Sequence, residues 1–382
     1  MKSWCLLLFS AISLFSEDFT LRVEGIEDEI LVSVPKNHEP GKTWPAVFYY
    51  HGTGGRPTTS LIRRHTGEND WIVVGMSYLQ RGTFQLKPET MVAEVAVLEK
   101  VKKELQERVN LDPARVYVSG FSKGGWMAGL FLQSVPSLAG GAILGAGHKD
   151  QLVAEPLPLE DGTPIFVGVG RHDPNYPFGL KALIFFRGLK GQVEMEAWPG
   201  LGHSFPREGS TGLREWFDMR LGREPKKEGL EKELAEILSK KDEFKRWWSL
   251  IEFYERPFVK ALPEFAEQVK QARMKQEVKS PRLAREARIL KESRRLLTGE
   301  IGLKTLESLE EIVAGYARIV EAAGESPQGR VAEKDHARAS EILVYARKEY
   351  GKQASEQEKK NNDPFKNKTG IERRGFRNPL VR

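Results

Sequence analysis

The chain has 382 residues, 40% of them hydrophobic and 29% charged, which fits a soluble globular protein long enough for two domains. Its single cysteine, Cys5, excludes an internal disulfide and a cysteine-based metal site. Residues 1–223 carry 24 basic and 25 acidic side chains, so their net charge is −1, and residues 224–382 carry a net charge of +7. No dense basic stripe in residues 224–382 favours nucleic-acid binding.

The first predicted element is a signal peptide at residues 1–16. Lys2 gives it a positive start, and the apolar run over residues 4–15 is too short to span a bilayer comfortably. We expect cleavage after Ser16 and a secreted or periplasmic protein that keeps no stable membrane span. An uncleaved anchor is the alternative interpretation.

Residues 17–222 alternate between strand and helix patterns, as a mostly parallel sheet requires. One helix is expected over residues 90–108, and another near residues 180–187. The first has these residues near helical spacing: Val92, Val95, Leu98 or its neighbour Val97, Lys102 and Leu105. Loops 79–88 and 154–164 are expected to line the substrate pocket, because ligands of such sheets bind beyond the carboxyl ends of the strands. The predicted strands are residues 19–23, 30–34, 44–50, 71–77, 116–119, 163–170 and 193–197.

The most informative motif is Gly-Phe-Ser-Lys-Gly at residues 120–124, between a predicted strand and a predicted helix. Strand, sharp turn and helix in this order are typical of a nucleophile elbow, which would project the Ser122 hydroxyl above the sheet. Only residues without a Cβ atom should fit at Gly120 and Gly124. Taken alone, the pentapeptide also fits an ordinary glycine-rich connection with a solvated serine.

A serine hydroxyl needs a base to take its proton and a third group to orient that base. In α/β-hydrolases these groups follow in the order Ser, Asp or Glu, His. Asp173 follows the predicted strand at 163–170, and His203 lies in the loop after the strand at 193–197. We therefore predict Asp173 as the orienting acid and His203 as the general base, since an imidazole accepts and returns a proton near neutral pH.

Other residues compete for these two roles. His172 adjoins Asp173, but neighbours on a turn usually point apart, and His148 precedes the strand that leads to Asp173. The alternative acids also have a simple interpretation as solvated loop carboxylates: Asp150, Glu155, Glu160 and Asp161.

The sequence His51-Gly-Thr-Gly-Gly55 follows the strand at 44–50 and resembles the loop that supplies an oxyanion-hole donor in lipases and esterases. The backbone N–H of Thr53 or Gly54 is the predicted first donor, and that of Lys123 the second. His51 is expected to order this loop rather than act as a base.

Together, these motifs resemble the α/β-hydrolase superfamily over residues 20–222. Within it they are most similar to the esterase branch of feruloyl esterases, acetyl xylan esterases and polyhydroxybutyrate depolymerases. The resemblance implies an ester hydrolase without cofactor or metal, in which Ser122 is the nucleophile, His203 the base and Asp173 its partner. Lys123 stands where many relatives carry a smaller polar residue, and no large insertion is present that would form a lid.

Residues 223–351 are predicted to form an all-helical extension, and 352–382 a disordered basic tail. Apolar stripes, such as Leu230, Leu234 and Ile237, favour a small bundle. We expect the side chains of Trp247 and Trp248 to be buried in the core or to dock onto the hydrolase domain, rather than to stack on a sugar. The expected helices are 229–256, 264–278, 283–297, 303–323 and 331–350.

The sequence thus predicts a secreted serine ester hydrolase with an α/β-hydrolase domain at 17–222, acting on a small-molecule or polymer-attached ester. A serine peptidase uses the same machinery and is the first alternative. A non-catalytic binding protein with a relic hydrolase core is the second. Because every candidate catalytic residue precedes Gly222, we expect the extension to be dispensable toward small esters.

Overall fold

The computed structural model describes residues 18–26, 28–39, 41–79, 88–148, 158–301 and 305–361. The predicted signal peptide, nearly all of loop 79–88 and the first part of loop 154–164 lie outside these ranges. Within the described ranges, no helix combines the length and the apolar character needed to cross a membrane.

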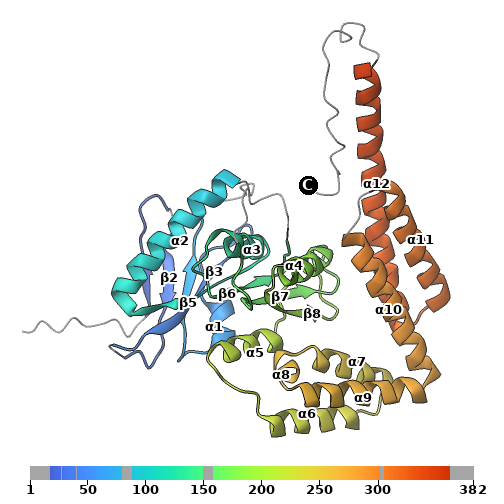
Figure 1. Ribbon diagram of the computed structural model, residues 1–382, viewed down its shortest axis with the longest axis horizontal. Coiled ribbons are helices and arrows are strands. Elements are labelled where there is room, and N and C mark those ends of the chain that lie inside the picture. The colour runs from blue at the N-terminus through green and yellow to red at the C-terminus, as the bar shows by residue number, and fades with distance from the viewer. Residues whose placement is uncertain are drawn as a thin grey trace, which may run out of the picture. The chain divides into compact units, whose positions relative to one another are not determined.

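A sheet forms the core of the N-terminal part (Figure 1). It has eight strands in the order β1-β2-β4-β3-β5-β6-β7-β8. β1 and β2 pair antiparallel, as do β2 and β4, whereas the pairs from β4 through β3, β5 and β6 to β7 are parallel. β3, β4 and β6 are buried along their whole length, as expected for parallel strands covered on both faces. The strands are β1 (Phe19–Leu21), β2 (Ile30–Ser33), β3 (Trp44–Tyr50), β4 (Ile72–Met76), β5 (Leu111–Phe121), β6 (Gly140–Leu144), β7 (Pro164–Gly170) and β8 (Gln192–Trp198).

Helices cover both faces of this sheet. The Phe131 ring of α3 (Lys123–Ser134) lies 5.0 Å from the ring of Tyr50, and the Trp216 ring of α5 (Thr211–Arg220) lies 5.9 Å from that of Tyr117. Tyr50 is in register with Gly120, three residues beyond Tyr117, so the pleat places the two tyrosines on opposite faces. The predicted α/β class with a mostly parallel sheet is therefore confirmed.

Three further helices complete this part: α1 (Ser60–Thr66), α2 (Pro88–Val109) and α4 (Tyr176–Gly188). α2 confirms the predicted helix at 90–108, and its buried face agrees with the prediction in part. Val97, Leu98 and Leu105 are buried as predicted, whereas Val92 is 73% exposed. The other buried residues of α2 are Met91, Glu94, Val101 and Val109. A carboxylate, Glu94, thus lies on the buried face.

Every regular element of the C-terminal part is a helix within the residues that the structure describes, as predicted. The expected single helix over 229–256 is wrong, because the chain breaks at residues 240–242, where the Asp242 side chain accepts a hydrogen bond from the Lys245 N–H (2.9 Å) and caps a new helix. The last helix ends at Asn361, so residues 352–361 of the predicted disordered tail are helical. The helices are α6 (Lys227–Ser239), α7 (Glu243–Tyr254), α8 (Pro257–Lys260), α9 (Pro263–Lys279), α10 (Pro281–Ile301), α11 (Leu306–Ala323) and α12 (Pro327–Asn361).

The apolar stripes of these helices pack against one another, as predicted. Leu230, Leu234 and Ile237 of α6 join a cluster with residues of α7, α8 and α9. A second cluster, which includes Tyr316, connects α10, α11 and α12. Trp247 is fully buried and its indole N–H donates to Glu277 (2.8 Å), so it belongs to the helical core.

The chain divides into two compact units. The first consists of residues up to Val169 with Leu183–Glu196 and Phe205–Arg223. The second consists of Gly170–Ala182, Ala197–Ser204 and the chain from Glu224 onward. The loop after β7 and the loop after β8 thus group with the helical extension, although they precede residue 222.

Candidate active site

Ser122 connects β5 to α3 at a sharp turn. Its backbone has φ 57° and ψ −118°, a conformation with positive φ that side-chain-bearing residues rarely adopt. The Ser122 N–H donates to the carbonyl of Leu144 (2.8 Å), and its carbonyl accepts from the N–H of Trp126 (3.1 Å). Strand, positive-φ serine and helix in this order have the arrangement that is typical of a nucleophile elbow.

The two glycines of the motif are required by close backbone packing. A Cβ atom at Gly120 would overlap with the backbone of Gly124, and one at Gly124 would overlap with the carbonyl oxygen of Tyr50 at the end of β3. The prediction that only glycine fits at these positions is confirmed.

The loop after β3 begins close to Ser122. An ideal Cβ atom at Gly52 would lie 3.3 Å from the Cβ atom of Ser122. The Gly55 N–H donates to the Gly52 carbonyl (3.1 Å) and closes a turn with Thr53 and Gly54 at its exposed corner. Gly54 has φ +74°, the left-handed region that glycine favours.

His51 is bound to its own loop. Its Nδ1 lies 2.8 Å from the Gly52 carbonyl oxygen, and its backbone carbonyl accepts a hydrogen bond from the Tyr78 hydroxyl (2.5 Å). Burial lowers the pKa of His51, against the opposing effect of the Gly52 carbonyl. This arrangement agrees with the expected ordering role.

A buried polar cluster of Glu94, Lys123 and Tyr78 lies beside the elbow. The Lys123 ammonium stands 4.4 Å from the centre of the Tyr78 ring, and burial lowers the pKa of Lys123 to about 8, although Glu94 raises it. The Glu94 side chain accepts from the Leu79 N–H (2.9 Å) through Oε1, while its Oε2 has no hydrogen-bond partner among the described residues. Burial raises the pKa of Glu94 to about 7.

Sequence reasoning missed this cluster. The sequence does contain a pattern that indicates it. Glu94 lies three positions after Met91 and four before Leu98, so helical spacing places its carboxylate on the buried face of α2. The backbone N–H of Lys123, the predicted oxyanion donor, is at the amino terminus of α3, where the amides of a helix lack partners within the helix.

Asp173 and His203 are brought together by the loops that follow β7 and β8. Oδ2 of Asp173 lies 2.8 Å from Nδ1 of His203, and Oδ1 accepts the N–H of Asn175 (2.8 Å). The Asp173 side chain is 1% exposed and that of His203 39%. A buried carboxylate at Nδ1 fixes the ring of an imidazole and directs Nε2 to accept a proton.

The alternative residues occupy other settings. His148 is buried and stacks on Phe185 with ring centres 3.6 Å apart, as a packing residue does. Glu160 and Asp161 lie on the surface, where Asp161 pairs with Lys190 (3.0 Å). Asp150 and Glu155 lie outside the described residues. Of the predicted acids that the structure describes, Asp173 is the one hydrogen-bonded to a histidine.

The mostly parallel sheet, the helices on both faces and the serine elbow define an α/β-hydrolase fold. No family model matches the chain. Carboxylesterase SOBER1 of Arabidopsis thaliana is 30% identical over 142 residues, which is 34% of this chain and 61% of that protein. A probable carboxylesterase, SOBER1-like, of the same plant is 29% identical over 126 residues, 32% of this chain and 47% of that protein. The matched segments thus span about half the length of these curated relatives.

Among solved structures, a Bacillus cereus carboxylesterase is 18% identical with a TM-score of 0.41, covering 50% of this chain and 93% of that chain. The curated relatives are carboxylesterases, which confirms the resemblance to esterases. None of these three comparisons covers more than half of this chain.

Proposed function

We propose that this protein is a carboxylic ester hydrolase that works through an acyl-enzyme, with Ser122, His203 and Asp173 as its catalytic triad. The observation that carries the proposal is the left-handed backbone of Ser122 between β5 and α3. A non-glycine residue is held in such a conformation at a cost of about 1–3 kcal/mol, and this strain is typical of functional sites.

In the first half-reaction, the Ser122 oxygen attacks the ester carbonyl while Nε2 of His203 takes its proton. Asp173 keeps the imidazole in position and stabilises its charged form. The backbone N–H groups of Lys123 and of Thr53 or Gly54 bind the oxyanion. The tetrahedral intermediate then collapses, His203 returns the proton to the alkoxide, and the alcohol departs.

In the second half-reaction, water attacks the acyl-enzyme. His203 takes a proton from this water, and the second tetrahedral intermediate breaks the bond to Ser122. The carboxylic acid leaves, and the proton on His203 passes to the serine oxygen. No cofactor or metal takes part in the proposed cycle.

Replacement of the nucleophile tests the proposal. Ser122→Ala should keep the fold and lower turnover of p-nitrophenyl acetate by several orders of magnitude, because triad members act as a unit. Equal activity of variant and wild type would remove Ser122 from the mechanism. Turnover of a p-nitroanilide at a rate similar to that of the matching ester would favour the peptidase alternative.

The sequence alone motivates a second proposal, that the protein is exported and acts outside the cytoplasm on a small or polymer-attached ester. Mass spectrometry of protein recovered from a secreting host should find a chain that starts near Glu17. A membrane-bound chain that retains Met1 would favour the anchor interpretation.

A further inference from the structure

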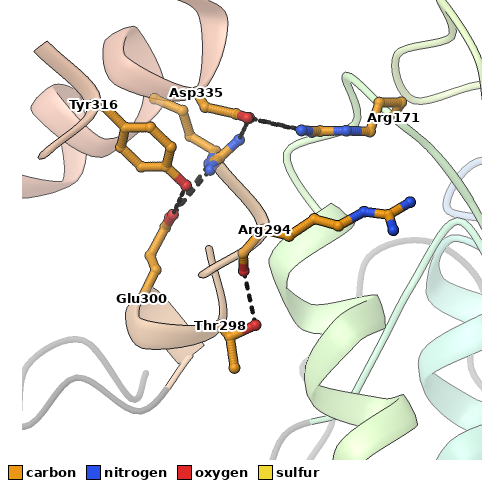
Figure 2. Close-up of polar contacts among 7 residues, drawn as sticks. Arg171, Arg294, Thr298, Glu300, Tyr316 and Asp335 are labelled. Atoms are coloured by element: carbon orange, nitrogen blue, oxygen red, sulfur yellow. Dashed lines mark hydrogen bonds and ion pairs between the residues drawn. The ribbon is translucent and has the colours of Figure 1, made fainter. Parts of the chain in front are cut away.

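The loop that carries Asp173 is tied to the last helix of the chain. The guanidinium of Arg171, two residues before Asp173, donates two parallel hydrogen bonds to the carboxylate of Asp335 on α12, at 3.2 and 2.8 Å (Figure 2). The two residues are 164 positions apart in sequence and belong to the same compact unit. Paired N–H groups on a carboxylate fix direction as well as distance.

The contact continues into the helical extension. Asp335 also accepts a hydrogen bond from Arg338 (2.5 Å), and Arg338 donates two bonds to Glu300 of α10, at 2.9 and 3.3 Å. The hydroxyl of Tyr316 on α11 lies 3.5 Å from the same Glu300 carboxylate. Three helices thus contribute to the network that holds Arg171.

This network of Arg171, Asp335, Arg338 and Glu300 alternates two cations with two anions in a largely buried setting. The side chains of Asp335 and Glu300 are 2% and 4% exposed. Burial alone would raise the pKa of Asp335, but the adjacent guanidinium groups of Arg171 and Arg338 outweigh it and hold that pKa below its usual value. Both carboxylates therefore have a charged partner inside the protein.

A buried ion pair often contributes little net stability compared with apolar packing, because desolvation offsets the attraction. We therefore expect this network to fix the position of Arg171 rather than to add stability. Arg171 is held from a second side, since its guanidinium lies 4.6 Å from the centre of the Tyr176 ring.

The backbone next to Arg171 joins the acid loop to the base loop. The Arg171 N–H donates to the carbonyl of Trp198, and the His172 N–H donates to the carbonyl of Leu201, both at 2.8 Å. At Gly170 the two loops come so close that a Cβ atom would overlap with the carbonyl of Gly202. A shift of Arg171 would therefore be passed to both Asp173 and His203.

We propose that Asp335, acting through Arg171, is a positioning residue for the Asp173–His203 pair, so that the helical extension is part of the catalytic apparatus. This inference rests on the proposed ester hydrolase function. It reverses the expectation that the extension is dispensable toward small esters.

The test uses the full-length chain with the variants Asp335→Asn and Arg171→Lys. Asp335→Asn removes the charge that binds Arg171, and kcat on p-nitrophenyl acetate should fall about 100-fold with KM nearly unchanged, the effect of displacing a catalytic group by about 1 Å. Arg171→Lys keeps the charge but loses the fork of two N–H groups, and should lower kcat about tenfold. The pH–rate profile of both variants should also differ from that of the wild type, because the imidazole that exchanges the serine proton is held less firmly.

The matched control is Leu309→Ala. Leu309 of α11 is fully buried against Leu343 and Ala346 of α12, so its truncation weakens the same helices without contact to Arg171. It should leave kcat within about twofold of wild type and the pH–rate profile unmoved when assayed well below its Tm.

The two levels of the proposal fail in different ways. If the wild type hydrolyses esters, Ser122→Ala does not, and both network variants keep the kcat and pH–rate profile of the wild type, Asp335 has no positioning role. If the wild type hydrolyses no ester, the proposed function itself is wrong, and the inference is overturned with it. If Asp335→Asn does not fold, Arg171→Lys alone decides, and an unchanged kcat in that variant overturns the inference.

Discussion

The buried carboxylate of Glu94 accepts the backbone N–H of Leu79 through one oxygen, while its second oxygen has no hydrogen-bond partner among the described residues. Lys123, the residue after the proposed nucleophile, is the cation whose charge lowers the pKa of Glu94. Burial outweighs this effect and raises the pKa of Glu94 from 4.5 to about 7, so the neutral form is favoured in the folded protein below about pH 7.

The first prediction follows from this shift. Between pH 4.5 and 7 the folded state binds more protons than the unfolded state, so the contribution of Glu94 to stability falls as pH rises through that window. The variant Glu94→Gln removes this titration. We compare the free energy of unfolding of the variant with that of the wild type at each pH. The variant's value minus the wild-type value should be larger at pH 8 than at pH 5 by about 1–3 kcal/mol, less any loss from leaving Lys123 without its counter-charge.

Urea unfolding of wild type and Glu94→Gln at the two pH values measures this difference. A gap between the two proteins that is the same at pH 5 and pH 8 would show that Glu94 is charged in the folded state throughout.

The second prediction concerns the close packing of the elbow. Gly124→Ala places a Cβ atom in overlap with the carbonyl of Tyr50, and neither backbone segment can move away. The substitution should lower the free energy of unfolding by about 3 kcal/mol or more, or prevent folding. Gly188→Ala at the end of α4 is the matched control, because a Cβ atom there meets no atom within 4 Å, and its Tm should stay near that of wild type. Equal Tm values for the two variants would contradict the packing described for the elbow.

The third prediction concerns the proposed acid. Asp173→Asn should leave the protein folded and lower kcat by about 10²–10⁴-fold, because the amide no longer holds the imidazole in the tautomer that accepts the serine proton. Asp161→Asn, on an exposed carboxylate paired with Lys190, serves as control and should keep the kcat of wild type. If both variants were equally active, Asp173 would have no part in catalysis.

The elbow was predictable because its signal is local. The spacing of Gly120, Ser122 and Gly124 between a strand and a helix determines which atoms meet, and the structure places them in that arrangement. Asp173 and His203 could be proposed because each follows a strand of the same sheet, and their hydrogen bond agrees with the predicted pairing.

The remaining features depend on contacts between distant segments. The break between α6 and α7 rests on one capping side chain, Asp242, within a sequence that otherwise continues in helical spacing. The pairing of Arg171 with Asp335 joins a loop to a helix that follows it after 155 or more residues. No local pattern distinguishes Asp335 from the many exposed acids of the extension, so its burial had to come from the fold.

The most direct test of the proposed chemistry is to identify the residue that a fluorophosphonate labels covalently. Such a probe reacts with a serine only when a base and an oxyanion hole activate that serine. Peptide mass spectrometry of the labelled wild-type protein should find one adduct, on Ser122, and labelling should be lost in Ser122→Ala and much slower in His203→Ala. A folded wild-type protein that takes up no label, or takes it up at another serine, would contradict the account.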